Sequence, residues 1–391
     1  MNAEVQVIHT RSLTDNVAPV TEPIHLDMCA SKEIRYSILH SQQPIFNVEA
    51  GLIAGIVEDR PVMLIVDGNV DRLHGQPIKS YASRHLNVAS TVVIEAQESH
   101  KTWQQAELIC NAAMDCGLGR TAVIVGIGGG VVLDLSGFAA SIFRRGIGYF
   151  RIPTTLIGQV DVSVGIKQGV NAGRFKNVLG SFYAPLASVN DISLLNTLPA
   201  LHIAAGFAEI IKMAVISDPV LFELVETYGS ELLDSRFQSP ASVAQSIMWR
   251  AEASMLRELK GNLFETTLQR LVDFGHTFSV AMEIDSGYQL PHGLAVGLDM
   301  LISTVIAVNR KICPKSVLER MLAIFKAVKL PLSQQICGAE KLHASLAAIR
   351  SHRGGDLNLV IPRNIGQPVF VQEISMDELT RALSFLAEVE S

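Results

Sequence analysis

The chain has 391 residues, of which 48% are hydrophobic and 18% are charged, and its formal net charge is −6 at pH 7. This length is too great for one ordinary core and favours two domains, while the composition is that of a globular enzyme and excludes a disordered chain. The negative charge and the lack of long basic runs argue against a nucleic-acid-binding protein, although a local cluster of Lys and Arg could still bind a small anionic substrate.

The N-terminal half is predicted to have an α/β structure. Residues 1–22 are polar and aperiodic, and we expect them to form a flexible arm. Short β-branched runs follow at Val62–Val66, Thr91–Ile94 and Thr121–Val125, and a helical pattern at Thr102–Cys116 separates the last two. Strands that alternate with helices predict a mostly parallel sheet with crossover helices.

The C-terminal half is predicted to be mainly helical. Apolar residues three and four positions apart indicate helices at Leu201–Ile216, Pro219–Leu232, Ser242–Leu259 and Leu294–Asn309, then a strand at Asn358–Ile361 and a helix at Asp377–Ala387. The pattern changes near Pro199. We therefore place an α/β domain at residues 23–198 and a helical domain at residues 199–391.

A glycine-rich turn follows the third predicted strand. The segment AVIVGIGGGVVLD places Gly126, Gly128, Gly129 and Gly130 at the start of a helix. There the backbone can approach a pyrophosphate, and the helix N-terminus favours its charge. Val131 stands at the third glycine of a G-x-G-x-x-G pattern, so the turn alone does not distinguish a nucleotide site from a tight turn.

Polar residues near the ends of two neighbouring strands favour the nucleotide site. Asp67 and Asn69 follow the first strand, and Glu98 and Lys101 follow the second. Each one alone could be a solvated surface residue. Because the carboxyl ends of parallel strands meet at one edge of a sheet, the four residues and the glycine-rich turn together indicate a nucleotide crevice.

Two histidines and one glutamate are candidate metal ligands. Most of the eleven histidines lie among polar residues, whereas His276 and His292 each adjoin a glycine and lead into an apolar helix. Glu209 lies in the apolar segment AAGFAEIIKMAVI, where an unpaired carboxylate would be costly to bury. Such a set is typical of catalytic zinc, but no H-E-x-x-H motif supports it, and spacing alone leaves ordinary structural histidines as the alternative.

The motifs from about Asp67 to the C-terminus resemble, in order, those of the dehydroquinate synthase family. They are DGNV, E-x-x-K at Glu98–Lys101, GGGVVLDLSGFAAS, RRG, IPTTLIGQVDVSVGIK, KN at Lys176–Asn177, AEIIK, DFGH and LPHG. The resemblance implies a Rossmann-like NAD-binding domain followed by a helical domain that binds metal and substrate. It also implies that the cofactors are NAD and a Zn²⁺ or Co²⁺ ion.

The resemblance assigns roles by motif position. The metal ligands would be Glu209, His276 and His292. NAD would contact Asp67, Asn69, Glu98, Lys101, Gly129, Gly130, Asp134, Thr154, Thr155, Lys176, Thr197 and Leu198. The substrate would contact Asp161, Lys167, Asn177, Lys212, Glu265 and Asp273, and Arg145 would reach its phosphate, within one subunit or across the interface of a homodimer.

Three departures from dehydroquinate synthases concern the substrate. Val280 replaces a second histidine, Asp273 replaces an asparagine, and Gln269 replaces an arginine that we associate with the substrate carboxylate. A carboxylate would bind poorly without that guanidinium, unless the neighbouring Arg270 takes its place. The late lysine pair of that enzyme is also missing, and the segment SHRGGD offers His352 and Arg353 as replacements.

The segments ELKGNLFE and HRGGDLNLVIP are similar to those of the sedoheptulose 7-phosphate cyclases. We therefore expect a lyase that converts sedoheptulose 7-phosphate to a C7 cyclitol, 2-epi-5-epi-valiolone, through transient oxidation by NAD, β-elimination of phosphate, reduction and intramolecular aldol closure. The alternatives are a 2-epi-valiolone or demethyl-4-deoxygadusol synthase, a 3-dehydroquinate synthase, a metal-dependent alcohol dehydrogenase, and an inactive binding protein. Val280 stands where we expect a proline in this subgroup.

The cell compartment is predicted from the N-terminus and the cysteines. The N-terminal segment lacks the apolar core of a signal peptide, and the most apolar stretch, VVLDLSGFAASIF, is too short to cross a bilayer. The five cysteines never form a C-x-x-C pair, which argues against a disulfide framework and favours a reducing compartment. We expect a cytoplasmic homodimer that acts on a small sugar phosphate and has no membrane or nucleic-acid partner.

Overall fold

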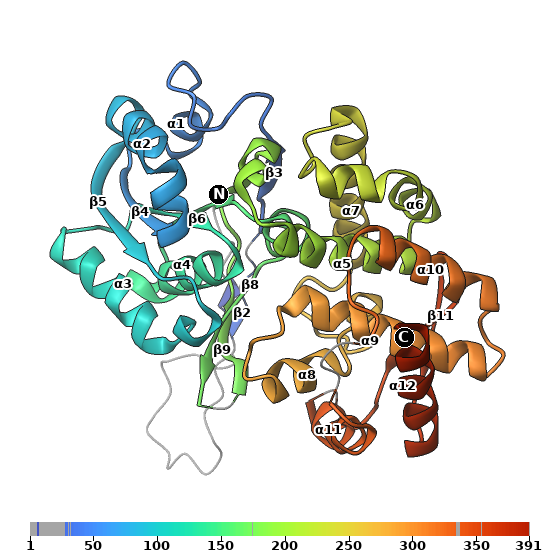
Figure 1. Cartoon of the computed structure of the whole chain (residues 1–391). Helices are drawn as coiled ribbons and strands as arrows, with labels where there is room; N and C mark the ends of the chain where they lie inside the picture. Colours follow the sequence, from blue (N-terminus) through green and yellow to red (C-terminus); the bar gives the residue numbers. More distant parts are fainter. Residues whose placement is uncertain are drawn as a thin grey trace, which may run out of the picture.

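The computed structural model describes residues 6–7, 28–29, 31, 33–173, 175–333, 337–352 and 354–390. The predicted arm at residues 1–22 lies outside the described residues, apart from β1 (Gln6–Val7), which pairs with β2 (Met28–Cys29). Figure 1 shows a part built on a sheet (blue to green) beside a helical part (yellow to red). The predicted fold class, an α/β N-terminal part followed by a mainly helical C-terminal part, is confirmed.

A six-stranded parallel sheet is the centre of the N-terminal part. The strands lie in the order β3 (Ser37–His40), β10 (Ala187–Asn190), β7 (Gly148–Pro153), β6 (Val123–Gly128), β4 (Pro61–Asp67) and β5 (Asn87–Ile94). The edge strand β3 pairs with a strand far along the chain, since Ile38 lies opposite Ser188. The helices that accompany the sheet are α1 (Leu52–Val57), α2 (Gly68–His85), α3 (Trp103–Asp115) and α4 (Gly130–Ile142).

The apolar run of β4 is buried on both faces of the sheet. Val62, Leu64 and Val66 pack into one hydrophobic cluster, which includes residues of α1 and α2. Met63 and Ile65 pack into the opposite cluster, which includes residues of α3 and α4. Because successive side chains of a strand point to opposite faces, a parallel strand with helices on both sides is hydrophobic at every position.

The C-terminal part consists mainly of helices. They are α5 (Ala200–Ile216), α6 (Pro219–Asp234), α7 (Ala241–Leu259), α8 (Ser279–Asp285), α9 (His292–Asn309), α10 (Lys315–Ala327), α11 (Ala339–His352) and α12 (Met376–Glu390), with the hairpin of β11 (Leu359–Asn364) and β12 (Gln367–Val371). Helix α9 is long and apolar enough to cross a membrane by length and composition, but 83% of its apolar window is buried inside the protein. It contacts α5, α8, α10 and α12, as expected of a central core helix.

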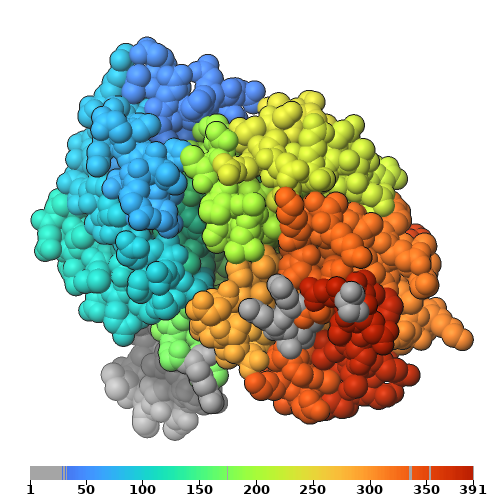
Figure 2. Space-filling view, in the orientation of Figure 1, coloured from blue at the N-terminus to red at the C-terminus, as the bar shows by residue number. Residues whose placement is uncertain are grey.

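The two parts are joined by shorter elements. The π-helical turn η3 (Gly158–Val162) and the antiparallel hairpin of β8 (Lys167–Ala172) and β9 (Phe175–Phe182) follow β7, and η4 (Ile192–Thr197) leads into α5. Further short helices are η1 (Glu98–His100), η2 (Phe143–Arg145) and η5 (Leu271–Asp273). In the space-filling view the segment near residue 200 lies between the two parts (Figure 2).

The strands and helices that we named from the sequence are present, with ends that differ by a few residues. The β8–β9 hairpin, helices α10 and α11, and strands β3, β7, β10 and β12 are among the elements that were not predicted. All five cysteines are free, which confirms that the chain does not use a disulfide framework. The predicted site residues Arg353 and the side chain of His352 lie outside the described residues.

Candidate active site

The three candidate metal ligands converge on one point. Glu209 lies in the middle of α5, His276 lies in the loop before α8, and His292 is the first residue of α9. One donor atom from each residue lies within 4.8 Å of the others. The Oε1 atom of Glu209 lies 3.8 Å from Nε2 of His276 and 3.5 Å from Nε2 of His292. Two imidazole nitrogens and a carboxylate oxygen in this arrangement could hold one divalent metal ion.

Each histidine is held through its other ring nitrogen. Nδ1 of His276 lies 3.2 Å from the carbonyl oxygen of Phe274, and Nδ1 of His292 lies 2.8 Å from Oε1 of Glu283. An N–H group that donates at Nδ1 leaves the lone pair on Nε2, which in both rings is the atom nearer to Glu209. The orientation of both rings therefore suits metal binding through Nε2.

The loop that carries His276 is fixed by Asp299 of α9. One carboxylate oxygen of Asp299 accepts N–H groups from Thr277 at 2.7 Å, Phe278 at 2.5 Å and Ser279 at 3.0 Å. Burial raises the pKa of Asp299 to about 6, although these backbone hydrogen bonds lower it. The loop that follows the histidine is thus tied to the helix that begins with His292.

Helices α5 and α9 approach each other closely at Gly293. A Cβ atom at Gly293 would lie 2.0 Å from the carbonyl oxygen of Ala205, which is closer than real Cβ contacts allow. Ala205 lies one helical turn before Glu209 on α5, and Gly293 adjoins His292. The glycine therefore permits the close packing that places Glu209, the candidate ligand on α5, beside His292, the candidate ligand on α9.

Buried charge surrounds the Glu209 carboxylate. Its Oε2 atom lies 2.5 Å from Nζ of Lys212, and that ammonium lies 3.5 Å from Asp161. Burial raises the pKa of Glu209, but Lys212, His292 and His276 together outweigh it and hold this pKa well below its usual range. Among the described residues, no hydrogen bond of good geometry reaches either oxygen of Glu209, although the side chain is only 1% exposed. The Oε1 atom, which faces both histidines and does not contact Lys212, is therefore placed to bind a metal ion.

The two histidines differ in charge. Burial and the Lys212 ammonium lower the pKa of His276 to about 3, so its ring is neutral, as metal binding requires. Burial also lowers the pKa of His292, but the carboxylates of Glu283 and Glu209 outweigh it and raise this pKa to about 9. A metal ion on Nε2 of His292 would take the place of that proton.

Residues that we predicted to form a nucleotide crevice meet at the carboxyl ends of β4, β6 and β7. A Cβ atom at Gly128 would lie 3.1 Å from Cβ of Asp67, and one at Gly129 would lie 3.1 Å from the Thr155 side chain. The backbone N–H of Thr154 donates to the carbonyl oxygen of Gly128 at 3.0 Å. The glycine-rich turn leads into α4 at Gly130. Its backbone, which carries no side chains at the glycines, thus lies beside Asp67 at the end of β4.

Residues 91–205 match the family model of the 3-dehydroquinate synthase N-terminal domain, and residues 206–350 match that of its C-terminal domain. The chain belongs to the 3-dehydroquinate synthase family. It is 39% identical over 349 residues to a 2-epi-5-epi-valiolone synthase of Streptomyces glaucescens, covering 88% of this chain and 89% of that one. It is 34% identical over 360 residues to the demethyl-4-deoxygadusol synthase of Trichormus variabilis, covering 90% and 88%.

A solved structure has the same fold. It is ValA, the 2-epi-5-epi-valiolone synthase of Streptomyces hygroscopicus subsp. jinggangensis 5008, with NAD⁺ and Zn²⁺ bound. It superposes with a TM-score of 0.88 at 36% identity, covering 92% of this chain and 99% of that chain. The family assignment therefore rests on sequence and on structure over most of the chain.

Several residues that the family resemblance assigns to NAD contact one another. Lys101 forms an ion pair with Asp134 and donates to Oδ1 of Asn177 at 2.7 Å. Glu98 accepts from the side chain of Asn171 at 2.9 Å, and the Asn177 N–H donates to that asparagine at 2.8 Å. The segment after β5, helix α4 and the β8–β9 hairpin are thus linked by polar contacts.

Consecutive ion pairs connect three further predicted substrate residues, Lys167, Glu265 and Asp273, through Arg270. Nζ of Lys167 lies 2.7 Å from Glu265, which also pairs with Arg270. Arg270 in turn pairs with Asp273 at 2.6 Å. The side chain of Gln269 contacts Asn358 at 3.5 Å. Arg270, which could have replaced the missing carboxylate-binding arginine, is thus already engaged by two carboxylates.

The remaining predicted residues lie less centrally. Arg145 is exposed at the end of η2 and has a left-handed backbone with φ 66°. Asn69 follows Asp67, whose carboxylate accepts its N–H at 2.7 Å. Thr197 lies 2.9 Å from Nε2 of His74, and Leu198 ends η4. Val280 is 40% exposed and lines an apolar hollow between α8 and α11.

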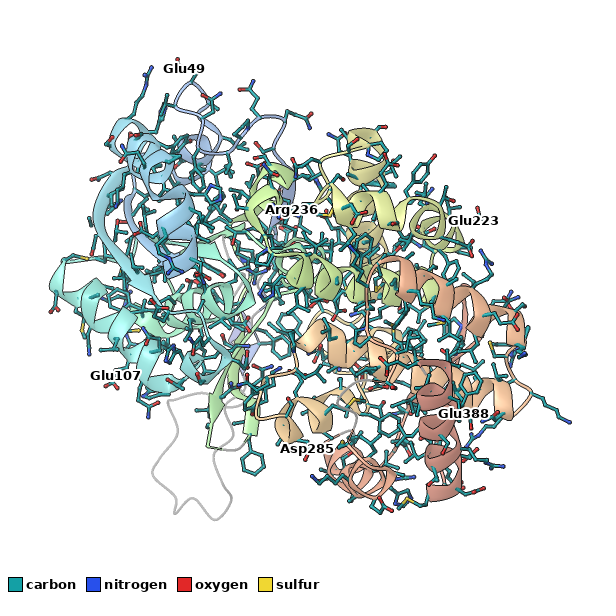
Figure 3. All side chains as sticks on the ribbon, in the orientation of Figure 1. Glu49, Glu107, Glu223, Arg236, Asp285 and Glu388 are labelled. Atoms are coloured by element: carbon teal, nitrogen blue, oxygen red, sulfur yellow. The ribbon has the colours of Figure 1, made fainter. Side chains whose placement is uncertain are left out.

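Sequence reasoning missed Glu283. The side chain of this residue of α8 is 3% exposed, and its carboxylate accepts hydrogen bonds from both His292 and Lys176. Figure 3 shows other acidic residues, such as Glu107 and Glu223, at the outer edge of the molecule. The signal was present in the segment VDFGHTFSVAMEI, because a carboxylate inside an apolar segment is the feature that pointed to Glu209.

Proposed function

We propose that the chain is a 2-epi-5-epi-valiolone synthase that converts sedoheptulose 7-phosphate to this cyclitol and releases phosphate. The observation that carries the proposal is the 39% identity, over nearly the full length of both chains, to an enzyme of that name. The net reaction is a phosphate elimination with ring closure, which makes the enzyme a carbon–oxygen lyase. No net oxidation occurs.

The proposed cofactors are NAD and Zn²⁺, or Co²⁺ in its place. Glu209, His276 and His292 would hold the metal, and the buried Oε1 atom of Glu209, which accepts no hydrogen bond of good geometry from the described residues, supports this fit. The glycine-rich turn, Asp67 and the Lys101 wall would hold NAD, and the NAD⁺ and Zn²⁺ bound to ValA support it. When bound, the metal polarises a substrate hydroxyl group and NAD takes up and returns its hydride.

The charges at the site support the proposed substrate contacts. Lys212 lies between Glu209 and Asp161, so it is placed to hold or move a proton at a hydroxyl group beside the metal site. Lys167 is 59% exposed on its side chain, so its ammonium could turn to a phosphate group. Arg145 and Asn177 are proposed to complete that phosphate site.

A substrate without a carboxylate is favoured over the acid that 3-dehydroquinate synthases use. Gln269 is neutral, and Arg270 is held by Glu265 and Asp273. A substrate carboxylate would therefore lose a charge-assisted bond and meet the negative Asp273. One such bond is worth roughly 1.5–3 kcal/mol, which corresponds to about one to two orders of magnitude in relative rate.

We further propose a cytoplasmic homodimer with a domain boundary between residues 198 and 199. The last strand of the sheet ends at Asn190 and α5 begins at Ala200, which supports the boundary. Strand β9 exposes the large apolar side chains of Phe175, Val178, Leu179 and Phe182, which supports an interface with a second copy.

The test is incubation of the purified enzyme with sedoheptulose 7-phosphate, NAD and zinc or cobalt, followed by identification of the product by NMR. We expect phosphate and the cyclitol in equal amounts, without accumulation of NADH. NADH that accumulates with product would favour an alcohol dehydrogenase and refute the proposal. A kcat/KM that is higher for the dehydroquinate synthase substrate would make the chain an unusual 3-dehydroquinate synthase.

A further inference from the structure

We propose that Glu283 is a positioning residue that orients the metal ligand His292 and the nucleotide-side Lys176 together, so that metal and NAD bind interdependently. This inference rests on the proposed function, because it concerns the same site. The geometry around Glu283 carries it: one carboxylate oxygen meets an imidazole of the helical part, and the other meets an ammonium of the β8–β9 hairpin.

The contact with His292 determines which ring nitrogen faces the other ligands. Oε1 of Glu283 accepts the Nδ1–H of His292 at 2.8 Å. The opposite nitrogen, Nε2, then lies 3.5 Å from Oε1 of Glu209. Without a carboxylate at position 283 the ring could turn or change its tautomer, and both changes would remove the lone pair from the metal position.

The contact with Lys176 reaches the other half of the molecule. Lys176 lies on β9, its side chain is 10% exposed, and its ammonium pairs with Oε2 of Glu283. A buried ammonium is costly without a charged partner, so the pair holds the end of this side chain in one place. By family motif Lys176 is a proposed NAD contact. Glu283 therefore connects a proposed metal ligand directly to a proposed nucleotide ligand.

Interdependence follows from this shared carboxylate. When NAD binds and fixes Lys176, it also fixes Glu283. Less conformational entropy is then lost when a metal binds to His292. Thermodynamic linkage then requires that the metal tighten NAD by the same factor by which NAD tightens the metal. A carboxylate that only filled space in the core would not make the metal affinity depend on NAD.

The chain offers a matched control in Glu252. This residue of α7 is also buried, accepts from Nε2 of His40 at 2.7 Å, and accepts from the side chain of Asn190 at 2.9 Å. His40 belongs to β3 and is not one of the proposed metal ligands. Loss of a buried carboxylate–histidine contact can therefore be compared at a position that serves the metal site and at one that does not.

The experiment measures the zinc dissociation constant by competition with a chromogenic chelator, with and without NAD and always without substrate. The variants are Glu283→Met, Glu283→Gln, Lys176→Met and Glu252→Gln, and circular dichroism verifies their fold. For Glu283→Met we expect zinc affinity to fall about 10–100-fold. The isosteric Glu283→Gln keeps an acceptor for the imidazole and should lose less zinc affinity, while Glu252→Gln should keep the wild-type value.

The effect of NAD on zinc affinity is the second measurement. In the wild type we expect NAD to tighten zinc on the order of fivefold or more. This factor should fall to one in Lys176→Met and in both Glu283 variants. Wild-type zinc affinity in Glu283→Met, or an unchanged NAD effect in Glu283→Gln, would overturn the inference while the proposed function stands. A wild-type protein that binds neither zinc nor NAD would overturn the proposed function as well.

Discussion

Replacement of Gly293 by alanine would test the packing that brings the proposed metal ligands together. The added Cβ atom would lie 2.0 Å from the carbonyl oxygen of Ala205. Real Cβ atoms essentially never come closer than 3.0 Å to a neighbour, so α5 and α9 would have to separate by about 1 Å. The obstacle is a backbone carbonyl, so no side-chain rotation can relieve the clash.

The size of this shift decides the outcome. Metal sites tolerate errors in ligand distance of about 0.2 Å, and a separation of about 1 Å between α5 and α9 exceeds this several times. Glu209 lies one turn after Ala205, and His292 adjoins the substituted residue, so the separation acts on both ligands directly. We expect zinc affinity to fall at least about tenfold and the free energy of unfolding to fall by about 1–3 kcal/mol.

The assays are chelator competition for zinc and chemical denaturation of the zinc-free protein. The control is Gly55→Ala in helix α1, where nothing lies within 4 Å of an added Cβ atom. Alanine at this exposed helical position should raise the free energy of unfolding by about 0.5–1 kcal/mol and leave the zinc affinity of the protein unchanged. Wild-type zinc affinity and wild-type stability in Gly293→Ala would refute the argument from helix packing.

Three other predictions concern the metal, the assembly and the pH dependence of stability. His276→Ala should contain no zinc and show no turnover by metal analysis and cyclitol assay, and full occupancy would remove it from the ligand set. Mixed dimers of Arg145→Ala and Lys167→Ala should regain activity if the arginine acts across the interface, and no recovery despite subunit exchange would place it within one subunit. Glu378 pairs with Arg310 at 2.6 Å, and chiefly this contact lowers the pKa of Glu378 to about 2. Glu378→Gln should therefore lower the free energy of unfolding by about 1–2 kcal/mol above pH 4.5. Denaturation at decreasing pH should show that the difference between variant and wild type vanishes toward pH 2.

The sequence was sufficient to predict many of the local elements and the edge of the sheet where the candidate nucleotide residues meet. The β-branched run of β4 and the acid at its end, Asp67, follow from strand periodicity and from the way parallel strands align. Glu209 was recognisable because burial of an unpaired carboxylate is costly. These inferences use only neighbours in sequence.

The pairing of charges could not be predicted in the same way. Lys101 was assigned to NAD, but it also pairs with Asp134, which lies 33 positions later. Lys176 and Glu283 are 107 positions apart in the chain. The packing of whole helices and strands determines which residues pair at such separations. Periodicity and spacing in the sequence do not predict these pairs. The tautomer of His292, which depends on Glu283, was therefore invisible before the fold was known.

The position of β3 has a consequence for the order in which the protein folds. This strand is made early, but Ile38 pairs with Ser188, and His40 donates to Glu252, which follows it by 212 positions. Neither partner exists when β3 leaves the ribosome. A nascent chain usually folds from its N-terminus, and contacts between distant segments form slowly. The first strand of this sheet must therefore wait until β10 has been synthesised, and its contact with Glu252 must wait until α7 has followed. Protection of its amides should appear among the last events of folding.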